Sequence, residues 1–357
     1  MMLQNKSKNI FWINAVRAIC IIAVYFVHCQ IYCGCWVNYT NVFIHPIYVN
    51  AFFFVSGYLL LRKQLTEPLK SQNFIEYING GGKTLIGNII YKLVIPTILF
   101  SLIEYLPKKI LRGEPIAVHT LLSNTIGGGT YWFTSALIVA EIVILLLLLT
   151  RSKKIYYYFI IGLLITALGL YLIQIDFHLF GFGRDPWAYR RGLLAVTFMM
   201  AGGVYWRYEE VFAKWMKWYV FTCLLATYVL IFSLIPNDVP VLVSTMDITW
   251  IGYLASLLGC VVLIEFCKKL KTIRFLTFVG QYSLCFYFFS GALPMLVTMV
   301  VKHFLPTENV LVMMLVFALC LFISTFVAYV LNKYLSFMFD LRIIIKNNKH
   351  ENSICIR

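Results

Sequence analysis

The stretch INAVRAICIIAVYFVHC (residues 13–29) places two ionisable side chains in an otherwise apolar segment. Arg17 and His28 are eleven residues apart, so on a helix they lie within about 20° of the same face and about 16 Å apart along the axis. The arginine is a permanent cation. The histidine can accept and return protons near neutral pH. Together they suggest proton chemistry beside an anion-binding group.

A structural explanation of the same two residues also exists. Arg17 could reach inward to lipid headgroups, and His28 could bond a backbone carbonyl at the membrane interface. Ionisable residues inside a membrane are costly and are commonly functional. These two residues alone leave both explanations open.

The composition places this segment in a membrane. The chain has 357 residues, of which 61% are hydrophobic and only 13% are charged, whereas soluble proteins average about 25% charged residues. Apolar runs of about twenty residues are long enough to cross a bilayer. We therefore predict an all-α, polytopic membrane protein with about ten transmembrane helices, at residues 11–30, 42–61, 86–106, 131–150, 155–175, 192–208, 217–235, 247–267, 279–301 and 309–332.

The basic residues predict the orientation of these helices. The formal charge of +15 gathers mainly in every second segment between the apolar runs, so it indicates membrane orientation and not nucleic-acid binding. Both termini are predicted to be cytoplasmic, with residues 62–85 inside and residues 107–130 outside. No soluble domain can be separated, so we predict one integral membrane domain over residues 1–340 and a basic cytoplasmic tail over residues 341–357.

The second apolar run, HPIYVNAFFFVSGYLLLRK, carries several polar groups. Asn50 and Ser56 lie within it, and Arg62 and Lys63 lie at its predicted cytoplasmic end. The Ser56-Gly57 pair allows either a close helix approach or room for a ligand.

Three further polar or aromatic residues lie in later runs. Trp132 is predicted at the outer interface, and Glu141 follows nine residues later near the midplane. A buried carboxylate must be protonated or paired, and Arg17 is a plausible partner. Tyr287 is predicted near mid-depth, although belt and core packing explain Trp132 and Tyr287 equally well.

Cysteines and glycines carry weaker signals. Cys29, Cys33 and Cys35 gather at the outer end of the first run, where a disulfide is open and no metal site is predicted because the spacing fits no zinc pattern. The glycine runs at 80–82 and 127–129 lack the partners of a phosphate loop, so we interpret both as flexible connectors.

Four features together resemble one family. They are the spacing of Arg17 and His28, FFFVSGYLLLRK in the second run, YWFTSALIVAE in the fourth and VGQYSLCFYFF in the ninth. They resemble the membrane-bound acyltransferase 3 family over residues 10–335. Ser290 is a departure, because family members often carry a histidine there, and the basic motif after the second run is only partly matched by RKQ.

The resemblance implies an O-acyltransferase of the bacterial cytoplasmic membrane. It implies transfer of an acyl group, usually acetyl, from cytoplasmic acyl-CoA to a hydroxyl of a carbohydrate outside the membrane. The essential histidine and arginine of the family correspond to His28 and Arg17, and its donor-binding motif corresponds to Arg62 and Lys63, with Ser56 nearby. Acyl-CoA is expected as a co-substrate, with no tightly bound cofactor.

On this interpretation His28 is a general base that activates the acceptor hydroxyl, although an acyl-histidine intermediate stays open. Trp132, Asn50, Ser56 and Tyr287 are candidates for stabilising the oxyanion. On the outer side, Arg184, Arg190 and Arg191 of GRDPWAYRRG are candidates for holding the acceptor, with headgroup contact as the alternative.

A transporter is the competing class. Arg17, His28 and Glu141 could form a substrate or proton path for a glycan or small molecule. Protection of the protein by acyl-CoA against heat would separate the two classes.

Overall fold

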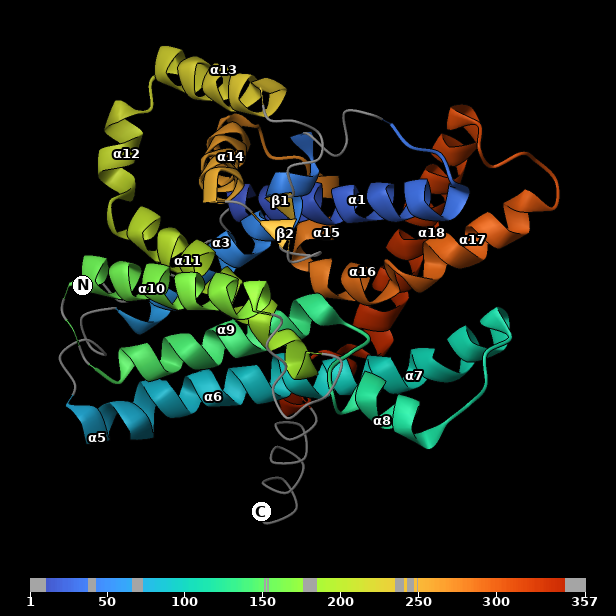
Figure 1. Cartoon of the computed structure of the whole chain (residues 1–357), viewed down its shortest axis with the longest axis horizontal. Coiled ribbons are helices and arrows are strands. Elements are labelled where there is room, and N and C mark those ends of the chain that lie inside the picture. Colours follow the sequence, from blue (N-terminus) through green and yellow to red (C-terminus); the bar gives the residue numbers. More distant parts are fainter. Residues whose placement is uncertain are drawn as a thin grey trace, which may run out of the picture. The chain divides into compact units, whose positions relative to one another are not determined.

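The computed structural model describes residues 11–37, 43–65, 73–150, 152, 154–175, 185–234, 241–242, 247–248 and 250–343 (Figure 1). Nearly all of these residues are helical, and the described strands are one antiparallel pair of two residues each. The predicted all-α class is therefore confirmed. Arg184 and most of the predicted basic tail lie outside the described residues.

The chain forms two units. The first contains residues 1–55, 209–242 and 247–325, and the second contains residues 56–208, 243–246 and 326–357. Two long helices, α3 (His45–Gln64) and α18 (Val310–Tyr334), contribute residues to both units.

The first unit is built around the buried helix α1 (Phe11–Cys33). α1 packs against α14 (Trp250–Lys269), α15 (Arg274–Gln281), α16 (Ser283–Phe289) and α17 (Ala292–Lys302), as Figure 1 shows for the blue and orange helices. α12 (Glu209–Trp215), α13 (Trp218–Leu234), β1 (Val241–Leu242) and β2 (Asp247–Ile248) complete the unit.

Two contacts hold α1 in this position. A side chain on Gly280 would lie 2.0 Å from the carbonyl oxygen of Asn14, so α15 approaches α1 at backbone distance only because this residue is glycine. The buried hydroxyl of Tyr25 donates to the Phe286 carbonyl at 2.9 Å and accepts from Ser324 at 2.7 Å.

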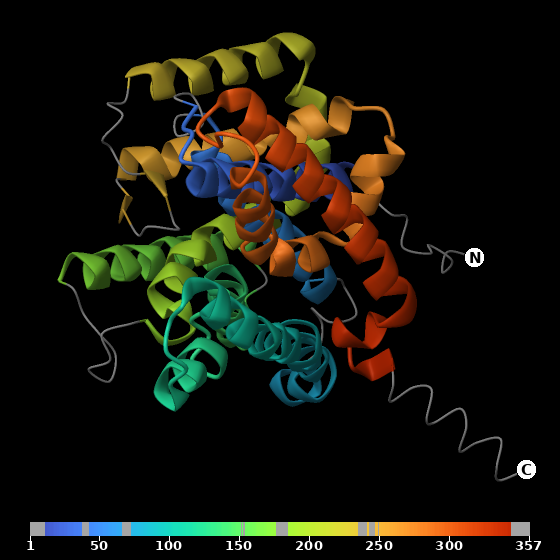
Figure 2. The ribbon, with the colours of Figure 1, turned by 90° about the vertical axis from the view of Figure 1, so that its right-hand side faces the viewer.

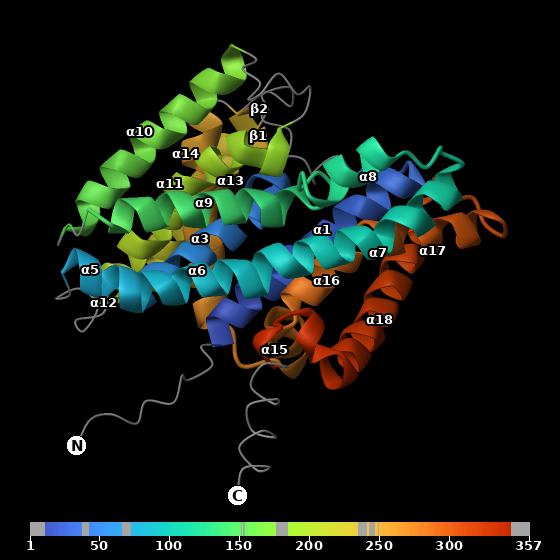
Figure 3. The same cartoon turned by 90° about the horizontal axis from the view of Figure 1, so that it is seen from below.

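The second unit begins with one long helical run. α5 (Phe74–Tyr77), the π-helical turn η1 (Ile78–Gly82), α6 (Lys83–Ile89), the π-helical turn η2 (Ile90–Val94) and α7 (Ile95–Arg112) follow without a break (Figure 3). α8 (Val118–Thr125) then packs beside α7. α9 (Trp132–Leu148), α10 (Ile155–Gln174), the short 3-10 turn η4 (Pro186–Ala188) and α11 (Tyr189–Arg207) form a layered group in which α11 contacts both α9 and α10.

The first glycine run is not the flexible connector that the sequence predicted. Gly80 to Gly82 form most of η1, inside the helical run. A side chain on Gly81 would lie 2.8 Å from the ring of Tyr77, so the glycines permit close packing. The second run forms the turn between α8 and α9, where Gly128 has a φ of 71°.

Each of the ten predicted segments contains helix. Among the described residues, five helical runs are long and apolar enough to cross a membrane, and up to seven are if each bent pair counts as one span. The five are Phe11–Cys33, Phe74–Ile110, Ile155–Gln174, Ile251–Lys269 and Val310–Tyr334. The number ten and the cytoplasmic termini stay predictions.

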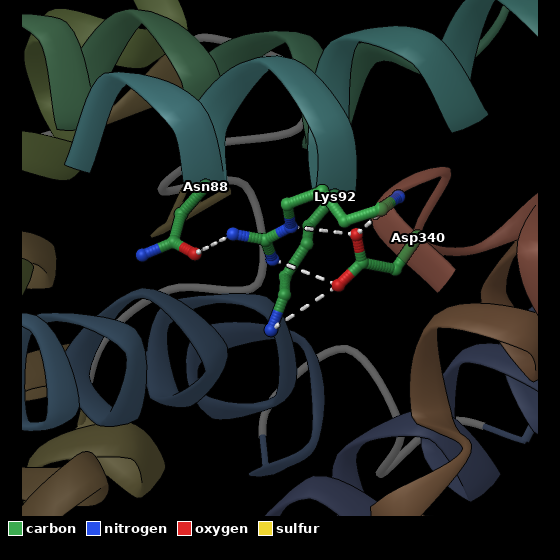
Figure 4. Close-up of polar contacts among 4 residues, drawn as sticks. Asn88, Lys92 and Asp340 are labelled. Carbon is green, nitrogen blue, oxygen red and sulfur yellow. Dashed lines mark hydrogen bonds and ion pairs between the residues drawn. The ribbon is translucent and has the colours of Figure 1, made fainter. Parts of the chain in front are cut away.

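After α18, the short turn η5 (Ser336–Met338) leads the chain back to the helical run that contains α6 and η2. The guanidinium of Arg342 donates to both carboxylate oxygens of Asp340, at 2.8 and 2.7 Å, and to Asn88 Oδ1 at 3.0 Å (Figure 4). Lys92 adds an ion pair to Asp340 at 3.8 Å. These contacts anchor the segment after α18 to α6 and η2, within the second unit.

Candidate active site on α1

Both residues of the opening motif lie on one uninterrupted helix. α1 runs from Phe11 to Cys33 and carries Arg17 and His28, each half-buried. The helix required by the sequence argument is therefore present. Its regular geometry keeps the two side chains near the same face.

His28 has a defined hydrogen-bond partner. Its Nδ1 lies 2.5 Å from the backbone carbonyl oxygen of Ser290. A carbonyl only accepts, so Nδ1 carries the hydrogen, and this assignment leaves the basic lone pair of the neutral ring on Nε2. A backbone carbonyl thus orients the ring and selects its tautomer, as in many catalytic histidines.

The Ser290 carbonyl accepts this bond because the helix is interrupted there. α16 ends at Phe289, α17 begins at Ala292, and their axes differ by 49°. In a continuous helix the Ser290 carbonyl would accept from residue 294, but Pro294 has no N–H. The carbonyl must find another donor, and His28 supplies it.

The sequence prediction missed this role of Ser290. It named Ser290 only as the position where family members often carry a histidine, and the serine hydroxyl donates to the Tyr287 carbonyl at 2.8 Å. The signal was the SGALP stretch, where a proline follows four residues after Ser290.

Arg17 has no hydrogen-bond or ion-pair partner among the described residues of its own unit. A half-buried guanidinium inside an apolar helix is costly without an anion. Glu141 is half-buried on α9 of the second unit. Its pairing with Arg17 stays a prediction.

Asn50 and Tyr287 are placed in the first unit. Asn50 is buried, and its amide donates to the Pro46 carbonyl at 2.8 Å. Its Oδ1 is buried without a hydrogen-bond partner among the described residues. Tyr287 is half-buried on α16, three residues before the Ser290 carbonyl.

The expected donor-binding residues belong to the second unit. Arg62 and Lys63 are exposed in the last turn of α3, and Ser56 is half-buried two turns earlier. A side chain on the adjacent Gly57 would lie 2.0 Å from the carbonyl oxygen of Met199. The Ser-Gly pair therefore serves a close approach of α3 to α11.

Two residues of the expected acceptor side, Arg190 and Arg191, lie near Trp132 or Asp185 in the second unit. The guanidinium of Arg191 lies over the ring of Trp132, 5.1 Å from its centroid. Nε of Arg190 donates to both carboxylate oxygens of Asp185, at 2.6 and 2.8 Å, in a nearly buried ion pair. Asp185 thus neutralises Arg190, whereas Arg191 forms a cation-π pair.

The cysteines at the C-terminal end of α1 and just after it are free thiols. Cys29, Cys33 and Cys35 are buried, and Cys33 contacts the hydroxyl of Thr298 at 3.6 Å. Among the described residues, no group of three or more histidine, cysteine, aspartate or glutamate side chains could hold a metal ion.

Comparison with known proteins assigns the chain. No curated protein and no solved structure matches it. The acyltransferase 3 family model, described as an acyltransferase domain, matches residues 10–333, nearly the whole chain. This range includes α1 and the break between α16 and α17. The chain therefore belongs to the acyltransferase 3 family.

Proposed function

We propose that this membrane acyltransferase transfers an acyl group, acetyl in the simplest case, from cytoplasmic acyl-CoA to a hydroxyl of a carbohydrate outside the bacterial cytoplasmic membrane. The observation that supports this most is the bond from His28 to the Ser290 carbonyl. In the neutral ring this bond leaves the basic lone pair on Nε2, the form required of a general base.

The transfer uses that nitrogen directly. Nε2 of His28 takes the proton of the acceptor hydroxyl while the hydroxyl oxygen attacks the thioester carbonyl carbon. The carbon–sulfur bond then breaks, and the CoA thiolate leaves and takes the proton from the imidazolium. The new bond is an O-acyl ester. A free CoA thiol is the second product.

Cationic residues serve the donor. Acyl-CoA carries a polyanionic nucleotide and a thin thioester arm, so exposed cations at a helix end concentrate it. Arg62 and Lys63 fit this role, because both are exposed in the last turn of α3. Arg17 has no anionic partner among the described residues of its own unit, and it supplies a guanidinium to the donor arm or the developing oxyanion.

The groups around the reaction have secondary roles. Asn50 and Tyr287 lie in the unit of His28 and are candidates for stabilising the oxyanion, and Ser56, Trp132 and Glu141 lie in the other unit. Arg191 and Arg184 are the proposed acceptor-side cations. Arg190 holds Asp185 and supports this side structurally.

The test is acyl transfer by the purified full-length protein in lipid nanodiscs. The donor is radiolabelled acetyl-CoA, and the acceptor is the surface glycan of the cells that make this protein, stripped of O-acyl groups with mild alkali. We expect His28→Ala to abolish transfer while acetyl-CoA still protects the variant against heat, because the base is needed for chemistry and not for donor binding.

His303 provides a matched control. Its Nδ1 also donates to a backbone carbonyl, that of Met299 at 2.9 Å, but the residue is exposed at the end of α17. His303→Ala should keep wild-type transfer. Wild-type transfer by His28→Ala would exclude this residue as the base, and no transfer by the wild-type protein would exclude the proposed reaction.

A further inference from the structure

A polar cavity lies between α7, α8 and the turn that precedes α9, and the mechanism above does not use it. Its volume is about 390 Å³, at the lower end of the range of about 300–1,000 Å³ for small-molecule sites. All its lining residues belong to the second unit. Figure 2 shows the short α8 folded back beside α7, both in teal.

The cavity is lined by hydrogen-bonding groups. Tyr105, Thr120, Asn124 and Thr130 contribute hydroxyls and one amide. Sites for acyl chains or aromatic ligands are lined mainly by apolar side chains, so this lining favours a ligand rich in hydroxyl or amide groups. The hydroxyl of Thr120 and the amide of Asn124 can donate as well as accept, which matches the dual character of a sugar hydroxyl.

Four charged residues complete the lining and cancel one another. Lys108 pairs with Glu104 at 3.5 Å, and Lys109 pairs with Glu114 at 2.6 Å. A strongly anionic or cationic ligand would have to disrupt one of these pairs. A neutral polyol can instead bond to both members, because lysines donate and carboxylates accept.

The cavity walls are held in place by bonds that a ligand need not supply. The Tyr105 hydroxyl donates to the Ala117 carbonyl at 2.9 Å, joining α7 to the start of α8. The Thr130 hydroxyl donates to the Asn124 carbonyl at 2.9 Å. Such preorganisation lowers the cost of ordering the site on binding.

α8 has a second face that fits the edge of a membrane. Val118, Leu122 and Ile126 follow at four-residue spacing, and they are 72%, 49% and 59% exposed. A short helix with one apolar and one polar face lies in the plane of the headgroups. The polar face, with Thr120 and Asn124, lines the cavity. This arrangement fits a cavity at the membrane surface, on the side predicted to be external.

The turn after α8 joins the cavity to the Trp132 and Arg191 pair. Ser135 of α9 donates to the Gly128 carbonyl at 2.8 Å, and the backbone N–H of Trp187 donates to the Gly127 carbonyl at 2.8 Å. The glycine turn thus forms one wall of the cavity and is bonded to α9, which carries Trp132, and to η4, which leads directly into α11 and Arg191.

From these observations we infer that this cavity is the acceptor subsite, which binds an uncharged, hydroxyl-rich sugar residue at the outer membrane surface. The inference rests on the proposed function and adds the class and the location of the sugar. The same sugar can come from a soluble polysaccharide or from a lipid-linked precursor, because the cavity lies beside an apolar surface.

The test fills the cavity without touching the donor site. Thr120→Trp places a large ring in the cavity, and Val118→Trp places the same ring on the exposed face of α8 as the matched control. We expect Thr120→Trp to lose transfer to the glycan while acetyl-CoA still protects it against heat. Val118→Trp should transfer as the wild-type protein does.

A milder pair of variants measures binding. Asn124→Ala removes one lining amide, and we expect the KM for the glycan to rise about three- to tenfold with kcat unchanged, as for the loss of one hydrogen bond. The neighbouring Ser123 does not line the cavity, so Ser123→Ala should keep the wild-type KM.

Two acceptors separate the sources of the sugar. One is the deacylated glycan released in soluble form, and the other is the lipid-linked glycan extracted from the same membranes. If transfer by the wild-type protein saturates with one of these acceptors and Thr120→Trp abolishes that transfer, the result supports the acceptor subsite. The acceptor that saturates identifies the source of the sugar. Wild-type transfer and KM in both Thr120→Trp and Asn124→Ala would overturn it while leaving the acyltransferase proposal intact. No transfer by the wild-type protein would overturn both.

Discussion

The Nδ1 of His28 donates its hydrogen to the backbone carbonyl oxygen of Ser290, four residues before Pro294. One residue on α1 is thus oriented by a carbonyl that a proline leaves without its helical donor. His28 and Ser290 are far apart in sequence, and no side chain of SGALP forms the bond.

Pro294→Ala should slow the reaction. Alanine restores an N–H where a regular helix would bond the Ser290 carbonyl, and this donor competes with His28. Loss of one such bond costs about 1 kcal/mol, so we expect kcat to fall about three- to tenfold. The pH dependence of kcat should change, with the acyl-CoA KM unaltered.

Pro306→Ala is the control for this variant, because Pro306 lies in the exposed turn after α17. A Pro294→Ala enzyme with wild-type kcat and pH profile would show that the carbonyl does not position the base.

Arg17→Ala should lose most of the protection that acyl-CoA gives against heat. The ligand stabilises the folded protein by RT ln(1 + [L]/Kd), about 2.7 kcal/mol at a hundred times Kd. Arg17→Lys should restore it only in part, because an ammonium lacks the planar, multi-donor fork. Arg207→Ala, at the exposed end of α11, is the control. Full protection of Arg17→Ala would remove Arg17 from the donor site.

Arg62 and Lys63 should account for much of the salt dependence of donor binding. Replacing both with glutamine should weaken acyl-CoA binding and flatten its response to ionic strength, because exposed charges are screened by salt. Binding is measured by titration from 50 to 500 mM salt, roughly a threefold range in Debye length. Lys333→Gln, in the last turn of α18, is the control. An unchanged salt response would place the donor phosphates elsewhere.

Gly57→Ala should destabilise the protein strongly. The new Cβ would lie 2.0 Å from the carbonyl oxygen and 2.3 Å from the Cα of Met199, both rigid backbone atoms. Overpacking of this kind costs about 1–3 kcal/mol. Gly87→Ala is the matched control within α6, since no atom lies within 4 Å of its new Cβ. That variant should be neutral or stabilised by up to about 1 kcal/mol. Equal melting temperatures for the two variants would contradict the close approach of α3 to α11.

Protonation of Asp340 in acid should make the protein less stable. Its hydrogen bonds to Arg342 lower the pKa of the carboxyl below its ordinary value. Because the pKa of this carboxyl is lower in the folded than in the unfolded state, the ionised carboxylate stabilises the folded protein at pH values above the ordinary carboxyl pKa near 4. This stabilisation is lost as the pH falls through the lowered pKa. Asp340→Asn should therefore lower the melting temperature at pH 7 and have little effect at pH 2.5.

The expected effect of Asp340→Asn is about 1 kcal/mol or less, because the ion pair is partly exposed. Glu210→Gln, at an exposed residue in the first turn of α12, is the control for loss of an acidic group. A difference between Asp340→Asn and the wild-type protein that is as large at pH 2.5 as at pH 7 would exclude ionisation of Asp340 as the cause.

Local sequence determined the helices and the contents of α1. Apolar runs predicted helix at all ten positions, because a chain in a bilayer must satisfy its backbone hydrogen bonds within each segment. The positions of Arg17 and His28 on one helix followed from spacing alone. The family also followed from local motifs, each contained in one helix.

Local sequence was misleading where packing outweighed propensity. Gly80 to Gly82 suggest a flexible connector, since glycine disfavours helix. In the structure they lie in a π-helical turn where Gly81 packs against the ring of Tyr77. Gly81 can pack against Tyr77 and Gln64 only because it has no side chain. The local sequence pattern does not predict this contact.

Only the tertiary structure decided the partner of His28 and the cavity beside α8. The partner is a backbone carbonyl 262 residues away, and a carbonyl is the same at every position, so residue type carries no sign of it. The cavity exists because α8 folds back beside α7 and the Gly128 turn closes one side. Such sites depend on distances between segments remote in sequence, which are set by packing and are not encoded in the periodicity of any single segment.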